Sequence, residues 1–432
     1  MKSPYFLNGD LKDASYLASQ IVQAAADQNL FVEQDPYGNV FVRKPANQNR
    51  MSVLLHGYTY AAAFLMTELI CASKIHCPEL EFLFSTRDHM NRSSARDFDM
   101  SQIRSRLVIN LDSETEEEII SSCAGFVRLV FETEIIRSQP MRGALPVQVR
   151  IFGLKGGHSA RDIQKGHANA IKLMGEFLFD WYNYSVDTQL VSVNGGLFTN
   201  SIPTECTARL LIREDLKENF ERGCWWFGED LNKRFASIDP DARIEVTFPS
   251  ANTEDDTWKP MPVDETGRII SFLNLCPDGA INMLQESENQ VETSCNIRNV
   301  VTEMDRWRLF TSIRSFDDSK KNALRDEFEL LAELNRIGFT SIGDFPSWKH
   351  ENVSNMQNRY EQAYKYCTGR PVKVVAAPEE QELLLFFQAM RDLEAICVGV
   401  NTKDGRPETE SLERISKVLK TMFDRFFNKQ TP

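Results

Sequence analysis

The sequence predicts an α/β domain that is interrupted by an inserted α+β domain. Short apolar stretches alternate with helix-like stretches up to about residue 126, which is the pattern of a largely parallel sheet covered by helices. Longer alternating strands follow, and the first pattern returns after residue 345. The length of 432 residues also exceeds the size at which one core usually stops growing. We therefore expect domain segments at 1–126, 127–345 and 346–432, the middle one being the insertion.

The first segment alternates between helix and strand signals. Leu17, Ile21 and Ala24 recur at helical spacing, so residues 11–30 are expected to form a helix. A turn is predicted at 35–39, where Pro36 and Gly38 stand together. A buried helix is expected at 61–73, and strands are expected at 40–42, 53–55, 80–84 and 107–111.

The inserted segment carries the longer alternating strands. We expect strands at 126–131, 147–152, 206–213, 243–248 and 306–314, with helices at 167–182 and 217–235. The last segment is predicted to contain a helix at 354–366, strands at 372–375 and 395–400, and a final helix at 410–427.

Composition and charge narrow the function classes. The chain is 42% hydrophobic and 26% charged, and its formal net charge of −13 argues against a nucleic-acid or anionic-membrane partner. No apolar run approaches a membrane span, and the first ten residues lack the apolar core of a secretory signal. Nine scattered cysteines without a CxxC pair indicate reduced thiols. We expect a cytoplasmic protein, with the acidic run Glu114 and 116–118 forming a solvated face.

The stretch 154–159, Leu-Lys-Gly-Gly-His-Ser, presents an imidazole and a hydroxyl on a turn that two glycines make flexible. Taken alone, it is compatible with an ordinary surface turn. It gains weight from other stretches that follow one another along the chain. These are 38–45, 109–114, 123–125, 194–196, 200–203, 291–294 and 313–315.

In this order the stretches resemble the aminoacyl-histidine dipeptidases (Xaa-His dipeptidase, peptidase D, carnosinase-like) of the di-zinc exopeptidase family. The resemblance covers nearly the whole chain. It implies a zinc-exopeptidase-like catalytic domain with an inserted lid domain, zinc as the family cofactor, and a dipeptide or another carboxylate as ligand. A homodimer is also possible for such a chain.

The resemblance supplies a metal-ligand set of which this chain keeps a part. His56, Asp88 and Asp112 match three family ligands. Tyr58 replaces the aspartate that orients the histidine, and the segment that carries the bridging aspartate is deleted before the helix at 61–73. Arg87 stands at the position of the general base, and a guanidinium stays protonated and cannot accept a proton. We therefore expect zinc to be absent or partial here.

Arg406 replaces the distal family histidine, and Glu380 matches a family glutamate upstream of it. One hypothesis is that Arg87 and Arg406 form salt bridges with Asp88 and Asp112 in place of the zinc charge. The alternative is that both are surface arginines. His56 likewise has two interpretations, a remnant ligand or a histidine satisfied at a strand end.

The lid residues of the resemblance are retained. His158 matches the group that stabilises the oxyanion, and Asn200 and Arg314 match the groups that hold the substrate carboxylate. The alternative for Arg314 is an exposed strand arginine. Two functions stay open: an inactive dipeptidase homologue that retains peptide or carboxylate binding, or an active dipeptidase for Xaa-His dipeptides with a reduced or rearranged metal site.

Overall fold

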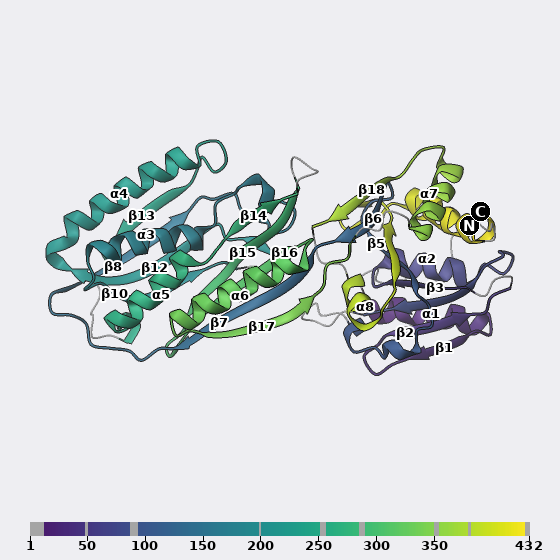
Figure 1. The fold of residues 1–432 in the computed structure, drawn as a ribbon, viewed down its shortest axis with the longest axis horizontal. Helices are drawn as coiled ribbons and strands as arrows, with labels where there is room; N and C mark the ends of the chain where they lie inside the picture. Colours follow the sequence, from purple (N-terminus) through teal and green to yellow (C-terminus); the bar gives the residue numbers. More distant parts are fainter. Residues whose placement is uncertain are drawn as a thin grey trace. The chain divides into compact units, whose positions relative to one another are not determined.

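The computed structural model describes residues 13–47, 51–86, 94–197, 200–250, 256–284, 290–349, 354–378 and 382–427. The chain forms two compact units, Met1–Cys123 with Trp348–Pro432, and Ala124–Ser347 (Figure 1). The backbones of Cys123 and Trp348 exchange two hydrogen bonds of 3.0 Å at the point where the chain leaves and re-enters the first unit. The sequence predicted the domain boundaries at 126/127 and 345/346, and in the structure they lie at 123/124 and 347/348.

The first unit contains a mixed eight-stranded sheet. Its inner strands β4, β3, β5 and β19 are mutually parallel, while β1 and β2 pair antiparallel at one edge. The spatial order of the strands is β1 (Phe31–Gln34), β2 (Val40–Lys44), β4 (Glu79–Phe84), β3 (Ser52–Gly57), β5 (Leu107–Ser113), β19 (Glu394–Gly399), β6 (Glu118–Cys123) and β18 (Lys373–Ala377).

Helices from both ends of the chain complete the core of this unit. Asp13 caps the first helix, and Leu17, Ile21 and Ala24 form its buried face, as their spacing predicted. One apolar cluster joins this face to Tyr360 and other residues of the C-terminal segment. The helices are α1 (Ala14–Asp27), α2 (Tyr60–Ile70), α7 (Asn355–Thr368), α8 (Leu383–Ala389) and α9 (Thr409–Thr421), the last continuing into a π-helical turn at Met422–Phe426.

The second unit is a nine-stranded antiparallel sheet with its own apolar core. The helices α3 (Ala170–Tyr184), α4 (Lys217–Arg234), α5 (Val263–Leu275) and α6 (Asp318–Leu334) contribute to that core. The strand order is β13 (Arg243–Thr247), β8 (Ala144–Phe152), β12 (Cys206–Arg213), β10 (Gln189–Gly195), β15 (Val291–Thr302), β16 (Arg306–Ser315), β7 (Gly125–Glu134) and β17 (Gly338–Phe345), with β14 (Gly279–Met283) paired to β15.

The predicted fold class is confirmed, since an α/β unit surrounds an inserted α+β unit. Each predicted strand and helix has a counterpart. The unpredicted elements are β1, β6, β10, β14, β15, β17, α5, α6, α8 and two short strand pairs, 157–158 with 201–202 and 402–403 with 406–407. The nine cysteines, all of which lie within the described ranges, form no disulfide, and seven of them are buried. Within the described ranges, every helix is too short or too polar to cross a bilayer.

The prediction that the acidic run is solvated is wrong for Glu116. Glu116 is 5% exposed, and its side chain accepts a 2.5 Å hydrogen bond from Ser411 and pairs with Arg414 at 2.9 Å. Glu114 and Glu117 are exposed as expected. Because α9 brings the two partners from nearly 300 residues away, the local charge pattern contained no sign of them.

Candidate functional site

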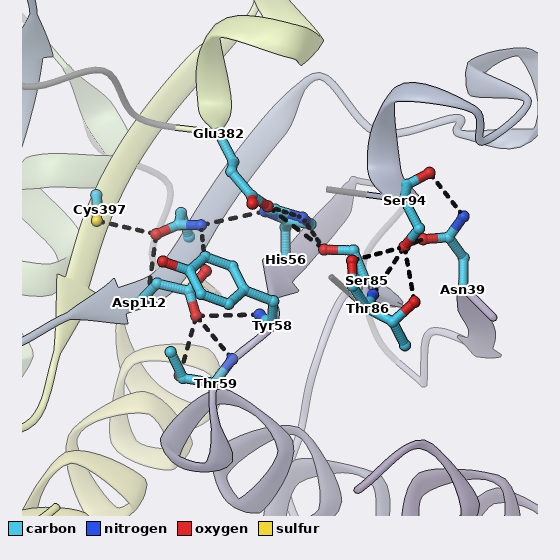
Figure 2. A network of polar contacts seen from close by, with 11 residues as sticks. Asn39, His56, Tyr58, Thr59, Ser85, Thr86, Ser94, Asp112, Glu382 and Cys397 are labelled. Carbon is cyan, nitrogen blue, oxygen red and sulfur yellow. Dashed lines mark hydrogen bonds and ion pairs between the residues drawn. The ribbon is translucent and has the colours of Figure 1, made fainter. Parts of the chain in front are cut away.

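The candidate site of the first unit lies at the carboxyl ends of β3 and β5. These strands pair in parallel with His56 opposite Asn110, so their ends meet at one edge of the sheet. The His56 side chain is fully buried. Figure 2 shows five side chains converging there. His56, Asp112 and Cys397 come from β3, β5 and β19, Ser85 follows the end of β4, and Glu382 precedes α8. We call His56, Ser85, Asn110, Asp112 and Glu382 the His56 cluster.

The side-chain amide of Asn110 links the two retained ligand candidates. Its Nδ2 lies 3.1 Å from Nδ1 of His56 and donates to Oδ2 of Asp112 at 2.9 Å. Its Oδ1 accepts from the backbone N–H of Asp112 at 3.1 Å and from the thiol of Cys397 at 3.0 Å. Two donors around Oδ1 fix the orientation of the amide. Nδ1 of His56 is therefore an acceptor, and the proton of a neutral ring lies on Nε2.

Asp112 is held by the turn that follows β3. Its Oδ1 accepts from the backbone N–H of Tyr58 at 3.0 Å and from the N–H and hydroxyl of Thr59 at 3.1 and 2.9 Å. Burial raises the pKa of Asp112, and these hydrogen bonds oppose the shift. A Cβ at Gly57 would lie 2.4 Å from the Cβ of Ala62 and 3.0 Å from Oδ1 of Asp112, so this close approach requires glycine.

The other side of the His56 ring faces Ser85 and Glu382. Nε2 lies 3.1 Å from the Ser85 hydroxyl and 3.6 Å from Oε2 of Glu382. The ring packs edge-on against Phe386 at 4.8 Å. A serine nucleophile needs a histidine nitrogen that accepts its proton, but Nε2 already carries one in this network. The Ser85–His56 pair therefore does not form a base-activated nucleophile.

A second polar network fixes the end of β4 beside the cluster. The Ser94 hydroxyl lies within hydrogen-bond distance of Asn39 and Thr86, at 2.5 and 3.1 Å, as Figure 2 shows. Nδ2 of Asn39 donates to Asp35 at 2.6 Å and to the Ser94 carbonyl at 3.0 Å. These bonds hold the chain on both sides of the segment 87–93. The stretch around Asn39, one of the motifs behind the resemblance, thus supports the backbone next to the cluster.

Several predicted residues lie outside the described ranges or away from the cluster. Arg87, Asp88 and Glu380 belong to the undescribed segments. Arg406 is exposed on the hairpin of β20 (Thr402–Lys403) and β21 (Arg406–Pro407). In the described part of the chain the partners of Asp112 are Tyr58, Thr59 and Asn110. The hypothesised salt bridge between Arg406 and Asp112 is therefore wrong; the turn after β3 satisfies the carboxylate instead.

The described residues do not fit a zinc ion as they are arranged. Zinc binding needs an unprotonated ring nitrogen with its lone pair directed at the metal. In His56 one nitrogen accepts from Asn110 and the other carries the proton toward Ser85 and Glu382. Within the described ranges no three His, Cys, Asp or Glu side chains are grouped as a metal site.

The second unit brings the three predicted lid residues around Ser159. His158, on β9 (Gly157–His158), pairs with Ser201 on β11 (Ser201–Ile202). The backbone N–H of Ser159 donates to the carbonyl of Asn200 at 2.9 Å. Nη1 of Arg314 donates to the Ser159 hydroxyl at 3.3 Å. We call His158, Ser159, Asn200 and Arg314 the Ser159 site.

The Gly-Gly turn sets the orientation of His158. Gly156 and Gly157 have φ angles of 63° and 141°, and a Cβ on either would lie within 2.8 Å of another atom. Nδ1 of His158 accepts from the backbone N–H groups of Ala160 and Arg161 at 3.2 and 3.4 Å. The proton of the neutral ring is therefore on Nε2, which is the nitrogen suited to donate to a ligand oxygen.

Arg314 is not the exposed strand arginine that the alternative interpretation described. Its side chain is 5% exposed because it lies over the ring of Phe126, 5.0 Å from the centroid. A guanidinium held against an aromatic face keeps its planar fork in a fixed direction. This arrangement suits a bidentate carboxylate contact.

Sequence reasoning missed Asn110, Ser85, Glu382 and Cys397. One usable signal was present for Asn110, which stands two residues before Asp112 on one strand and must share its face. Glu382 lies two residues beyond Glu380, in the same acidic stretch. For Cys397 the sequence offered no signal, because β19 reaches β5 only through the sheet topology.

Comparisons with known proteins agree with this fold. A family model described as a peptidase dimerisation domain matches residues 149–234. The chain is 24% identical over 426 residues to the cytosol non-specific dipeptidase of Escherichia coli (strain K12), covering 89% of this chain and 86% of that protein. A crystal structure of aminoacylhistidine dipeptidase from Vibrio alginolyticus superposes with a TM-score of 0.77 at 23% identity, covering 94% and 92% of the two chains. These similarities confirm the resemblance that the ordered motifs predicted.

Proposed function

We propose that this chain is a dipeptidase-like protein that binds a peptide or a related carboxylate through its second unit without hydrolysing it by a two-metal mechanism. The single observation that carries the proposal is the Asn110 amide, which donates to both His56 and Asp112. One neutral group thereby uses the lone pairs that a metal would need.

The sequence departures support the same conclusion. The resemblance assigns the base position to Arg87, which cannot accept a proton from water. It also assigns a bridging aspartate to a segment that this chain lacks. Loss of a positioned base alone removes on the order of 10²–10⁴ in rate. An arrangement that lacks both the base and the bridging ligand is poorly suited to hydrolysis.

The Ser159 site supports retained binding. Arg314 offers parallel N–H donors for a carboxylate. Its position over the Phe126 ring already restricts its side chain, so less conformational entropy is lost on binding. Nε2–H of His158 is a second donor, and Asn200, whose backbone carbonyl accepts from Ser159, is exposed. The binding role needs no metal and no proton transfer, so it is independent of the state of the His56 cluster.

An active dipeptidase remains the second candidate, and Glu382 favours it. Its carboxylate reaches the His56 cluster, with Oε2 3.6 Å from Nε2 of His56. A carboxylate in that position has the chemistry of a general base. In this case a rearranged site would act on Xaa-His dipeptides.

Metal content and turnover, measured on one full-length preparation purified without chelator, separate the two candidates. The first predicts well under one zinc per chain and no hydrolysis of Xaa-His dipeptides with added zinc, manganese or cobalt, while calorimetry still detects dipeptide binding. The E. coli relative serves as a positive control for the assay. Turnover that disappears in Asp112→Ala would establish the second candidate instead.

We also infer that the chain forms a homodimer through its second unit and acts in the cytoplasm. The matched family model is described as a dimerisation domain. Trp225 and Trp226 are 57% and 60% exposed on α4, within the matched residues. Large apolar side chains that are exposed side by side commonly mark a protein contact. Cysteines that form no disulfide fit a reducing compartment.

A further inference from the structure

We propose that Asn296 and Ser312 form, beside Arg314, a subsite that recognises the amide N–H next to the carboxylate of the ligand. The inference rests on the proposed carboxylate binding at the Ser159 site and adds a ligand class. The ligand would be a peptide or an N-acylated amino acid, rather than any small carboxylate.

The strand register places these residues together. On β15 and β16, Asn296 pairs with Ser312, and Ser294 pairs with Arg314. Because alternate strand residues share a face, Ser312 and Arg314 lie on the same side of β16. The alternate residues on these strands, Cys295, Ile297 and Ile313, pack into the core of the second unit. Cross-strand neighbours at this spacing are within reach of one bound molecule.

Asn296 and Ser312 each carry a buried polar atom that has no hydrogen-bond partner among the described residues. The Asn296 side chain is 1% exposed, and its Oδ1 accepts no hydrogen bond there. The Ser312 side chain is 4% exposed, and its hydroxyl likewise makes no hydrogen bond within the described ranges. Native proteins rarely leave such atoms unsatisfied, because the loss of hydration is not repaid. A bound group that supplies the missing hydrogen bonds would remove this penalty.

The orientation of the Asn296 amide is fixed by β11, the strand that follows Asn200 and pairs with the strand of His158. Its Nδ2 donates to the carbonyl of Ser201 at 3.0 Å. Ser201 is in turn paired with His158. The donor end of the amide is therefore occupied, and Oδ1 presents acceptor lone pairs only. Oδ1 of Asn296 can therefore accept a hydrogen bond only from a donor group of the ligand.

The chemistry of the face follows from these assignments. Arg314 donates and takes a carboxylate, Oδ1 of Asn296 accepts, and the Ser312 hydroxyl can do either. A ligand that complements all three carries a hydrogen-bond donor next to its carboxylate. The backbone N–H of a peptide's C-terminal residue has that relationship, since it shares the α-carbon with the carboxylate.

A pair of probes that differ only in that N–H tests the subsite. Calorimetry compares alanyl-alanine with its ester analogue alanyl-lactate, in which oxygen replaces the N–H, on the full-length protein. We expect the dipeptide to bind at least tenfold more tightly, because a site built around a donor rejects the analogue that lacks it. The ratio should fall toward one in Asn296→Ala and decrease in Ser312→Ala. Asn219→Ala, on α4, is the matched control and should keep the wild-type ratio.

The outcomes are distinguishable. Equal affinity of the wild-type protein for the two probes, with both lost in Arg314→Ala, would overturn the subsite and leave carboxylate binding in place. Binding of neither probe by the wild-type protein would overturn the proposed function itself. The wild-type ratio needs no substitution, so a variant that fails to fold does not prevent a decision.

Discussion

Nδ2 of Asn110 lies 3.1 Å from Nδ1 of His56, and the same amide reaches the carboxylate of Asp112 at 2.9 Å. A neutral donor thus satisfies two groups that the resemblance assigns to metal binding. The arrangement needs no cation to balance Asp112, because the turn after β3 supplies three further donors to it. Protein groups alone therefore supply the hydrogen bonds that His56 and Asp112 accept.

Asn110→Asp should convert this cluster into a zinc-dependent one. The change replaces the shared donor by a second carboxylate beside Asp112, and an unpaired buried charge costs about 3–5 kcal/mol of unfolding free energy. Zinc should restore part of that loss, which urea unfolding with and without zinc chloride would measure. Asn110→Leu is the control, since it removes the donor and offers no ligand. A zinc response of equal size in both variants would contradict the prediction.

Thr59→Val should destabilise the first unit. The Thr59 hydroxyl accepts from the backbone N–H of Ala62 at the start of α2 and donates to Oδ1 of Asp112 at 2.9 Å. Loss of a helix cap and of a bond to a carboxylate should lower the unfolding free energy by about 1–3 kcal/mol. Thr59→Ser retains the hydroxyl and should remain near wild type in the same denaturation experiment. Equal stability of wild type and Thr59→Val would exclude this role.

Arg314→Lys should weaken dipeptide binding by about tenfold or more. An ammonium group cannot reproduce the parallel N–H pair of a guanidinium, so the bidentate contact is lost although the charge remains. Calorimetry measures the change, and near-ultraviolet circular dichroism checks the fold. Arg306→Lys is the control on the same strand, because Arg306 is partly exposed and pairs with Glu132. If both variants bind like wild type, Arg314 does not hold the ligand.

Asp278 should make the second unit more stable in mild acid than at neutral pH. Burial raises the pKa of this carboxyl to about 7, whereas an unfolded aspartate titrates near 3.9. Between about pH 4 and 7 the folded protein holds the extra proton, so its unfolding free energy falls as pH rises, by about 2–4 kcal/mol in total. Above about pH 7 both states are ionised and the contribution stays constant.

The matched variant for this prediction is Asp278→Asn. Oδ1 of Asp278 accepts both the Ile297 N–H and the Asn169 amide, at 2.7 and 2.9 Å, and an asparagine oxygen can retain both bonds. Urea unfolding at pH 5 and pH 7.5 should show a smaller pH difference in the variant than in wild type. An unchanged difference would assign the pH effect to other groups.

Trp225→Glu or Trp226→Glu should dissociate the proposed homodimer. A charge in the middle of an apolar contact loses its hydration without gaining a partner. Light scattering should give twice the chain mass for wild type and the single mass for either variant. Tyr37→Glu is the control, since Tyr37 is 58% exposed in the first unit. If the mass of the wild-type protein by light scattering is that of a single chain, the proposed homodimer is wrong.

The sequence predicted elements well where the signal was local. Val53, Leu54 and Leu55 are fully buried in β3, as a continuous apolar run of a parallel strand should be. The two glycines before His158 do adopt left-handed backbone angles. The interpretation failed where partners come from far along the chain, as with Glu116 and Arg414. Asn110 belongs to the stretch 109–114 that supports the resemblance. Its role as a donor to His56 depends on the position of β3 beside β5, which the sequence does not reveal.

The position of β19 between β5 and β6 has a consequence for how the protein matures on the ribosome. β5 and β6 are synthesised before the second unit, but the strand that separates them is synthesised only after the whole second unit. The second unit is continuous in sequence and can complete its own core before that point, since domains tend to fold as units during synthesis. Until β19 has been synthesised, the sheet of the first unit has unpaired strand edges. Such edges can pair with other chains and aggregate, or be bound by chaperones. Chains that stop before Glu394 should therefore yield a folded second unit attached to an unfinished first one.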